Sequence, residues 1–136
     1  MSYWQMQLNK ENDDEFYDIK QLLIETRVIG MDYNETNAKE VNEFEILMHK
    51  GDIVLIRNYN KAIALVQITG LFNDLGRNKN KPNLDWFRFR RQVKVLVFLN
   101  NKVLPFSVNK KVIECIQEDN NSSFEYIHKF YLKNKE

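Results

Sequence analysis

Apolar and polar positions along the chain predict strands and helices that alternate in sequence. Residues 3–8 alternate aromatic or apolar with polar side chains, which is typical of a short strand. Polar residues at 12–14 can start a helix, apolar residues between Phe16 and Thr26 recur at helical spacing, and Gly30 is the expected stop. A polar turn then leads into a second short helix over residues 41–48.

The clearest pattern is a β-hairpin in the middle of the chain. Two runs rich in β-branched residues, 53–56 and 62–69, flank turn residues at 58–61. Residues 73–85 then contain almost no apolar side chains and predict a long loop. Loops of that length inside a domain are usually functional or disordered.

The second half predicts one long strand followed by helices. The strand runs from Trp86 to Leu99 and is expected to break at Asn100 and Asn101. A short strand over 103–106, a helix over 108–117 and a final helix after 121–123 follow. The strands are too close in sequence for βαβ crossovers, so we expect a small α+β domain with a curved, barrel-like antiparallel sheet.

Composition fits one domain and hints at a polyanion partner. The 136 residues are 43% hydrophobic and 29% charged, and we place a single domain at 1–132 with 133–136 as a tail or linker. The net charge is only +1, yet residues 1–50 hold five basic and eleven acidic side chains, against fifteen and eight in residues 51–136. This asymmetry suggests a polyanion-facing surface on the second half.

Several classes of function are not indicated. The lone Cys115 forms neither an internal disulfide nor a zinc site, and the two histidines have no ligand spacing around them, so no metal or cofactor is expected. The glycines match no phosphate-binding loop, and no apolar run is long enough to cross a membrane. We therefore expect a cytoplasmic, non-catalytic binding module.

Basic residues gather around the start of the long strand. Seven lie between residues 77 and 94 against one acid, Asp85, and a phosphate backbone would suit such a field. Alternation in the strand puts Phe87 and Phe89 on one face and a row of guanidinium groups on the other. The plain alternative is a solvated strand face. The candidate nucleic-acid contacts are Arg77, Lys79, Lys81, Arg88, Arg90 and Arg91.

Aromatic residues supply candidates for stacking on a base. A flipped base needs an aromatic-walled pocket, although any single ring is more often part of a core. Tyr59 at the hairpin tip and Tyr33 in a polar turn are the two most expected to be exposed. The full set is Trp4, Tyr33, Tyr59, Phe72 and Trp86.

The order of these elements resembles the PUA-like superfamily, in particular its EVE and YTH branches. The similarity covers residues 2–117 and rests on Gly51-Asp52-Ile53-Val54, on Ala62 to Gly70, and on the Trp- and Arg-containing strand that ends in Val93-Lys94-Val95-Leu96. The resemblance implies a pseudobarrel that flips a modified base into an aromatic cage. Domains of this kind also stand at the N-terminus of McrB-like restriction proteins, where they select the DNA to be cut.

The resemblance implies a base pocket but not a complete cage. The YTH pattern has a tryptophan just after the first helix, where this chain has Ile29-Gly30-Met31-Asp32-Tyr33. Its second cage tryptophan lies in the loop before the long strand, where this chain has none until Trp86. The candidate pocket residues are Trp4, Asp32, Tyr33, Tyr59 and Trp86, with Asp32 accepting a hydrogen bond from a base amine.

Two functions therefore stay open. The first is a DNA-binding specificity module whose partners are DNA, methylated or not, and a motor or nuclease domain or subunit. The second is a protein-interaction or small-ligand domain of the same fold, in which the basic loop only aids solubility.

Overall fold

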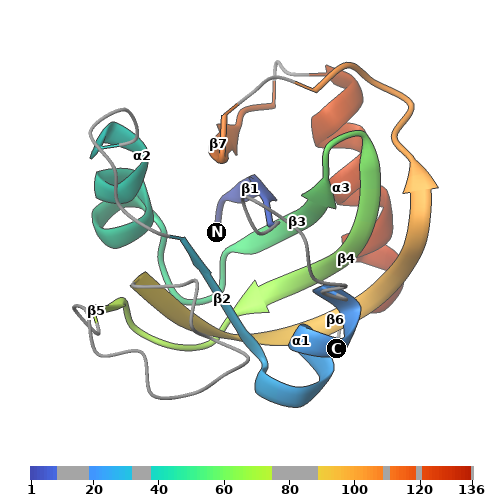
Figure 1. Cartoon of the computed structure of the whole chain (residues 1–136). Coiled ribbons are helices and arrows are strands. Elements are labelled where there is room, and N and C mark those ends of the chain that lie inside the picture. The colour runs from blue at the N-terminus through green and yellow to red at the C-terminus, as the bar shows by residue number, and fades with distance from the viewer. Residues whose placement is uncertain (9–18, 32–37, 75–88, 109–110, 119–120, 136) are drawn as a thin grey trace.

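A curled, mixed β-sheet forms the centre of the molecule (Figure 1). The computed structural model describes residues 1–8, 19–31, 38–74, 89–108, 111–118 and 121–135. Its strands lie in the order β2-β6-β4-β3-β1-β7, and β5 also pairs with β6. They are β1 (Tyr3–Gln7), β2 (Val28–Met31), β3 (Ile53–Asn58), β4 (Lys61–Ile68), β5 (Asn73–Asp74), β6 (Phe89–Val103) and β7 (Ile113–Ile116).

The α+β class and the curved sheet are as expected, with one parallel pair added. Strands β1 and β3 run parallel, with Tyr3 beside Ile53, while the other paired strands are antiparallel. The chain between them holds helix α1 (Ile19–Thr26), β2 and helix α2 (Ala38–Asn42). A parallel pair needs such a long crossover, so the expectation of a purely antiparallel sheet is wrong for this pair.

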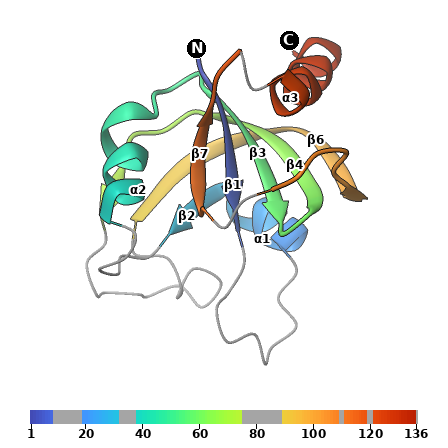
Figure 2. The ribbon, with the colours of Figure 1, turned by 90° about the horizontal axis from the view of Figure 1, so that it is seen from above.

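The sheet is buried on both faces because helices cover it from opposite sides. Side chains alternate along β3, so Val54 and Ile56 enter an inner core with Trp4, whereas Ile53 and Leu55 enter an outer core. Helix α1 closes the inner core, and α3 (Asn121–Asn134) closes the outer core through the fully buried Ile127. Figure 2 shows α3 and α1 on opposite sides of the sheet.

Helix α1 ends earlier than the pattern suggested. It stops at Thr26, and Arg27 takes a left-handed conformation with φ of 51° while donating its N–H to the carbonyl of Leu23. Strand β2 then starts at once, and Gly30 lies within it beside Arg90. The prediction that Gly30 stops the helix is therefore wrong, because the turn at Arg27 already reverses the chain.

Strand β6 continues through the asparagines that were expected to break it. Asn100 and Asn101 both have positive φ, 51° and 58°, and the strand runs on to Val103. Between the paired positions Ala62–Lys102 and Ala64–Phe98, β6 has two more residues than β4. Asparagine tolerates the left-handed region, so the pair forms a bulge that bends the strand.

The predicted helix over 108–117 is wrong, since Ile113–Ile116 is strand β7. It pairs with β1, and Cys115 lies beside Trp4. Ile113 packs in the inner core and Ile116 in the outer core, as a strand buried on both faces requires. The hairpin is confirmed as β3–β4, the second helix as α2 with a π-helical turn, η1 (Glu43–Leu47), and the last helix as α3.

Candidate nucleic-acid interface

The ends of three strands meet at Phe89, the first residue of β6. Phe89 pairs with Met31, the last residue of β2, on one side and with Asp74, the last residue of β5, on the other. The segments 32–37 and 75–88 continue from these ends. The predicted site residues that they carry lie outside the described part of the chain: Asp32, Tyr33, Arg77, Lys79, Lys81, Trp86 and Arg88.

Three phenylalanines form a platform beneath these strand ends. Phe72 stacks on Phe89 with ring centroids 5.3 Å apart and planes 24° apart, and Phe44 meets Phe72 edge-on at 5.8 Å. Phe44 is fully buried and Phe72 only half-buried. Phe72 was singled out from the sequence as an aromatic candidate, and this phenylalanine platform gives it an apolar, partly open face.

In the described part of the basic strand, Arg90 and Arg91 do not form the expected exposed row of guanidinium groups. Arg90 and Arg91 are 7% and 4% exposed. Arg91 donates from Nε to the Gly70 carbonyl at 3.3 Å and from Nη1 to the carbonyls of Phe44, at 3.0 Å, and Met48. Burial lowers the pKa of Arg91, an effect that Asp52 opposes. The prediction that these two arginines lie on an exposed phosphate-binding face is corrected, because both lie within the packed sheet.

Trp4 belongs to the inner core and not to an open pocket. Its side chain is 1% exposed, and its Nε1 donates to Oδ2 of Asp52 at 3.0 Å. The same buried carboxylate also accepts the backbone N–H groups of Ser2 and His49, at 2.9 Å each. In the described structure, the Asp52 carboxylate thus ties Trp4 on β1 to the turn before β3. The expectation that Trp4 forms a cage wall is therefore corrected, because its side chain is buried in the inner core.

Tyr59 is exposed as expected but lies at the other end of the sheet. It is 66% exposed, at the tip of the β3–β4 hairpin. The hairpin tip pairs Lys61 with Val103 at the end of β6, whereas the phenylalanine platform lies at its start. The prediction that Tyr59 shares a pocket with Trp86 therefore finds no support in the register of the strands.

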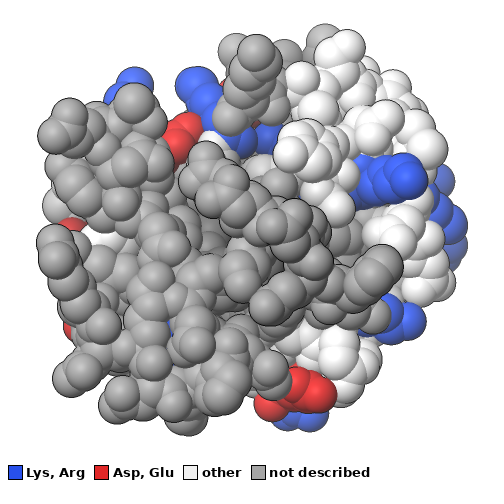
Figure 3. Space-filling model, viewed as in Figure 1, with Lys and Arg blue, Asp and Glu red and all other residues white. Residues whose placement is uncertain are grey.

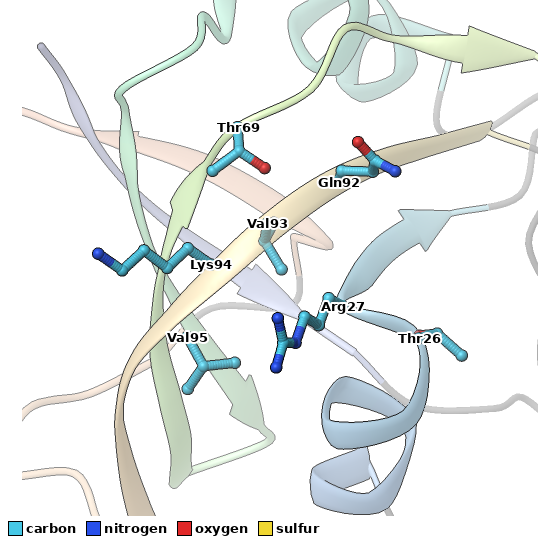
Figure 4. Close-up of a pocket in the computed structure, with 7 residues that line it drawn as sticks. All are labelled: Thr26, Arg27, Thr69, Gln92, Val93, Lys94 and Val95. Atoms are coloured by element: carbon cyan, nitrogen blue, oxygen red, sulfur yellow. The ribbon is translucent and has the colours of Figure 1, made fainter.

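A groove beside the α1–β2 junction was not found from the sequence. Figure 4 shows its lining, with Arg27 contributed by the turn and Lys94 by β6. Sequence reasoning counted Lys94 in the basic run and passed over Arg27. The available signal was weak: one basic residue between a helix end and a β-branched pair. In the described part of the face in Figure 3, basic side chains are spread out and do not form one continuous patch.

Candidates for acid–base or metal chemistry are few in the described part of the chain. No group of three His, Cys, Asp or Glu side chains that could hold a metal ion is found there. Burial raises the pKa of the Cys115 thiol, and the carboxylates of Asp52, Glu43 and Glu114 add to the shift. A thiol of this kind is a poor nucleophile. None of the described helices is long and apolar enough to cross a membrane.

Comparison with known proteins defines the fold. The sequence matches no protein-family model and no curated protein. The structure, however, shares the α+β fold of the Mmi1 YTH domain and of human THYN1. A protein from Pseudomonas putida superposes with a TM-score of 0.59 at 12% identity, over 93% of this chain and 99% of that one.

Two similar structures contain nucleic acid. The YTH domain of the Zygosaccharomyces rouxii MRB1 protein, in complex with N6-methyladenosine RNA, has a TM-score of 0.57 at 9% identity, over 95% of this chain and 86% of that one. Human THYN1, in complex with DNA containing 5-methylcytosine, has a TM-score of 0.56 at 16% identity, over 100% and 99%. At these identities the likeness concerns the fold.

Proposed function

We propose that this chain is a nucleic-acid recognition domain that binds DNA and reads a single base taken out of the stack. The observation that carries the proposal is the meeting of β2, β5 and β6 at Phe89. Segments 32–37 and 75–88 are far apart in sequence, yet the strand ends from which they continue meet at Phe89, a member of the phenylalanine platform. A base-flipping domain needs an aromatic surface with polar groups beside it.

The proposed base pocket keeps fewer residues than the sequence suggested, because Trp4 is buried and Tyr59 lies at the other end of the sheet. Tyr33 and Trp86 provide its walls, Asp32 accepts a hydrogen bond from a base amine, and the half-buried Phe72 contributes to its floor. Arg77, Lys79, Lys81 and Arg88 contact the phosphates on either side. The similar folds in complex with methylated RNA and methylated DNA support modified-base reading as the first specificity to test.

The biological setting that we propose is target recognition in a McrB-like restriction system. In that setting the chain contributes specificity, and nucleotide hydrolysis and cleavage belong to a motor or nuclease domain or subunit. The proposal gives the chain itself no catalytic role.

The test is fluorescence anisotropy with unmodified, N6-methyladenine and 5-methylcytosine duplexes at about 50 and about 200 mM salt, a range over which phosphate-dependent affinity falls steeply. We expect salt-dependent binding with a preference for one methylated duplex, because phosphate contacts release counterions and the pocket reads the base. Tyr33→Ala and Trp86→Ala should remove the preference. Tyr59→Asn is the matched control, since it deletes an exposed aromatic ring at the opposite end of the sheet and asparagine suits its φ of 54°.

The outcomes separate the candidate functions. Binding without a methyl preference keeps the DNA role and removes the cage. No binding to any duplex or to the corresponding RNAs would overturn the proposal and favour the protein-interaction domain.

A further inference from the structure

The groove between the α1–β2 junction and β6 has the chemistry of a phosphate site. We infer that it binds the phosphate backbone of the recognised nucleic acid, with Arg27 and Lys94 each contacting a different phosphate. The inference rests on the proposed function and adds a second site to it, separate from the base pocket.

The lining of the groove combines positive charge, hydrogen-bond donors and a small apolar surface. It encloses about 670 Å³, and none of its described lining residues is acidic. The side chains of Arg27 and Lys94 are exposed and form no hydrogen bond or ion pair with other described residues. Thr69 and Gln92 add a hydroxyl and an amide. The lining residues are Thr26, Arg27, Thr69, Gln92, Val93, Lys94 and Val95.

The backbone holds this lining in place. The carbonyl of Arg27 accepts the N–H of Val93 at 2.9 Å, and the N–H groups of Thr69 and Gly70 both donate to the carbonyl of Gln92. A Cβ at Gly70 would lie 2.9 Å from Cβ of Gln92, so only glycine allows this close approach. A rigid frame of this kind lowers the entropic cost of fixing a ligand.

Arg27 reaches the groove from a conformation that glycine would adopt more easily. Its φ is 51°, a region in which residues with a Cβ are strained. A left-handed residue is common directly after a helix, where glycine is the usual choice. Figure 4 shows the guanidinium of Arg27 extending toward Val95, while Lys94 points away from it. The two cations thus lie apart, on opposite sides of β6, and each can contact a phosphate of its own.

The distance to the base pocket fits a nucleic-acid strand. In the ladder between β2 and β6, Val28 pairs with Gln92 at the groove and Met31 pairs with Phe89 at the platform. Three residues of strand correspond to about 10 Å. The phosphates of one duplex strand recur with an axial rise of about 3.4 Å and lie farther apart through space, so a phosphate close to the flipped base can reach the groove. An isolated phosphate-sized ligand would not need this spacing.

The experiment measures the salt dependence of binding to the preferred duplex for wild type, Arg27→Gly, Lys94→Ala and the double variant. Arg27→Gly removes the side chain and suits the backbone, so the fold should be retained. Lys133→Ala is the control, because it removes one charge from exposed α3 on the far side of the sheet. We expect each groove variant to reduce the magnitude of the negative slope of log K against log salt by about 0.9, the double variant to reduce it by about twice that, and the control to change it little.

Each result decides between the two proposals. A double variant whose slope equals that of the control overturns the groove assignment while leaving DNA recognition intact. A wild type that binds neither duplex nor RNA overturns both. Binding of a poly-glutamate peptide with the same dependence on Arg27 and Lys94, and of no oligonucleotide, would assign the groove to an acidic protein partner and overturn the phosphate assignment.

Discussion

At the scale of single residues, buried charged side chains such as that of Arg91 form hydrogen bonds with backbone groups that lie outside the β-ladders. Arg91 reaches three carbonyls, those of Gly70, Phe44 and Met48, and so joins β6 to the π-helical turn and to the segment after β4. Guanidinium suits this role because it offers five donors in a fixed plane. A sequence pattern of alternating aromatic and basic residues does not distinguish this use from a phosphate contact.

Replacing Arg91 tests this assignment directly. We expect Arg91→Met to lower the free energy of unfolding by about 2–4 kcal/mol, because it leaves buried carbonyls without donors. Urea denaturation measures the change, and Lys94→Met, an exposed site on the same strand, should stay within about 0.5 kcal/mol of wild type. Full stability in Arg91→Met together with weakened DNA binding would restore Arg91 as a phosphate contact.

Asp52 organises the other end of β3 in the same way. Its carboxylate accepts three donors: the indole of Trp4 and the N–H groups of Ser2 and His49. We expect Asp52→Asn to lower the free energy of unfolding by about 1–3 kcal/mol, because an amide turns one acceptor into a donor facing these N–H groups. In a Trp86→Phe background, the fluorescence of Trp4 should shift to longer wavelength as its indole gains contact with water. An unchanged urea midpoint would contradict the role of Asp52.

At the scale of elements, the bulge in β6 replaces the chain break that two asparagines suggested. Asn100 and Asn101 have left-handed backbones inside a continuous strand. We expect Asn100→Val to lower the free energy of unfolding by about 1–2 kcal/mol, because a β-branched side chain is strained at positive φ. Thermal unfolding of Asn100→Gly, which suits that backbone, provides the control. Equal stability of the two variants would argue against the bulge.

A second element contact predicts a dependence of stability on pH. Glu40 on α2 accepts the N–H of Val112 just before β7, and its pKa is raised, first by burial and then by Glu43, despite the opposing effects of that hydrogen bond and of Lys111. Folding therefore favours the protonated acid. The stability gained from this preference is fully present below the ordinary pKa of a glutamate side chain in an unfolded chain, and it is lost as pH rises through the raised pKa of the folded state.

Glu40→Gln isolates this effect because glutamine keeps an acceptor for Val112 without titrating. We expect the variant to gain stability relative to wild type as pH rises from about 4 to about 7, through and above the ordinary glutamate range, measured by urea denaturation at each pH. Glu45→Gln, at an exposed position of η1, is the matched control for the loss of one carboxylate from the same region. A constant difference between Glu40→Gln and wild type across this range would contradict the prediction.

The sequence predicts those elements whose pattern lies within one short segment of the chain, and it fails where distant segments must pair. The β3–β4 hairpin and α3 are local patterns and are confirmed. Strand β7 is not local: Ile113 and Ile116 fit one turn of a helix as well as a strand with both faces buried, and only pairing with β1 decides between them. The parallel pairing of β1 with β3 likewise depends on a crossover that no local pattern specifies.

The site shows the same division. The sequence shows where basic and aromatic residues lie along the chain, but it does not show which of them are buried. Trp4, Arg90 and Arg91 were therefore assigned to a surface that they do not occupy. Arg27 was missed because it enters the groove from the turn that follows α1, and no local pattern placed that turn beside β6. Asp32, Tyr33 and Trp86 stay predictions.

At the scale of the whole molecule, the two cores are opposite faces of the same strands. The inner core contains Val54 and the outer core contains Leu55, one residue apart on β3. A strand cannot lose the packing on one face and keep its register on the other. Unfolding should therefore be a single cooperative transition, even though the phenylalanine platform lies in one core and α3 covers the other.

Loss of packing under α3 should therefore lower the stability of the inner core, which contains the phenylalanine platform, by as much as that of the outer core. We expect Ile127→Ala to lower the free energy of unfolding by about 2–5 kcal/mol, since the side chain is fully buried, whereas Leu132→Ala on the same helix, 50% exposed, should change it little. In a Trp86→Phe background, tryptophan fluorescence reports the inner core through Trp4, and far-ultraviolet circular dichroism reports the whole backbone. Both should shift to the same lower midpoint in Ile127→Ala, whereas a fluorescence midpoint that stays at the wild-type value would show that the two cores unfold separately.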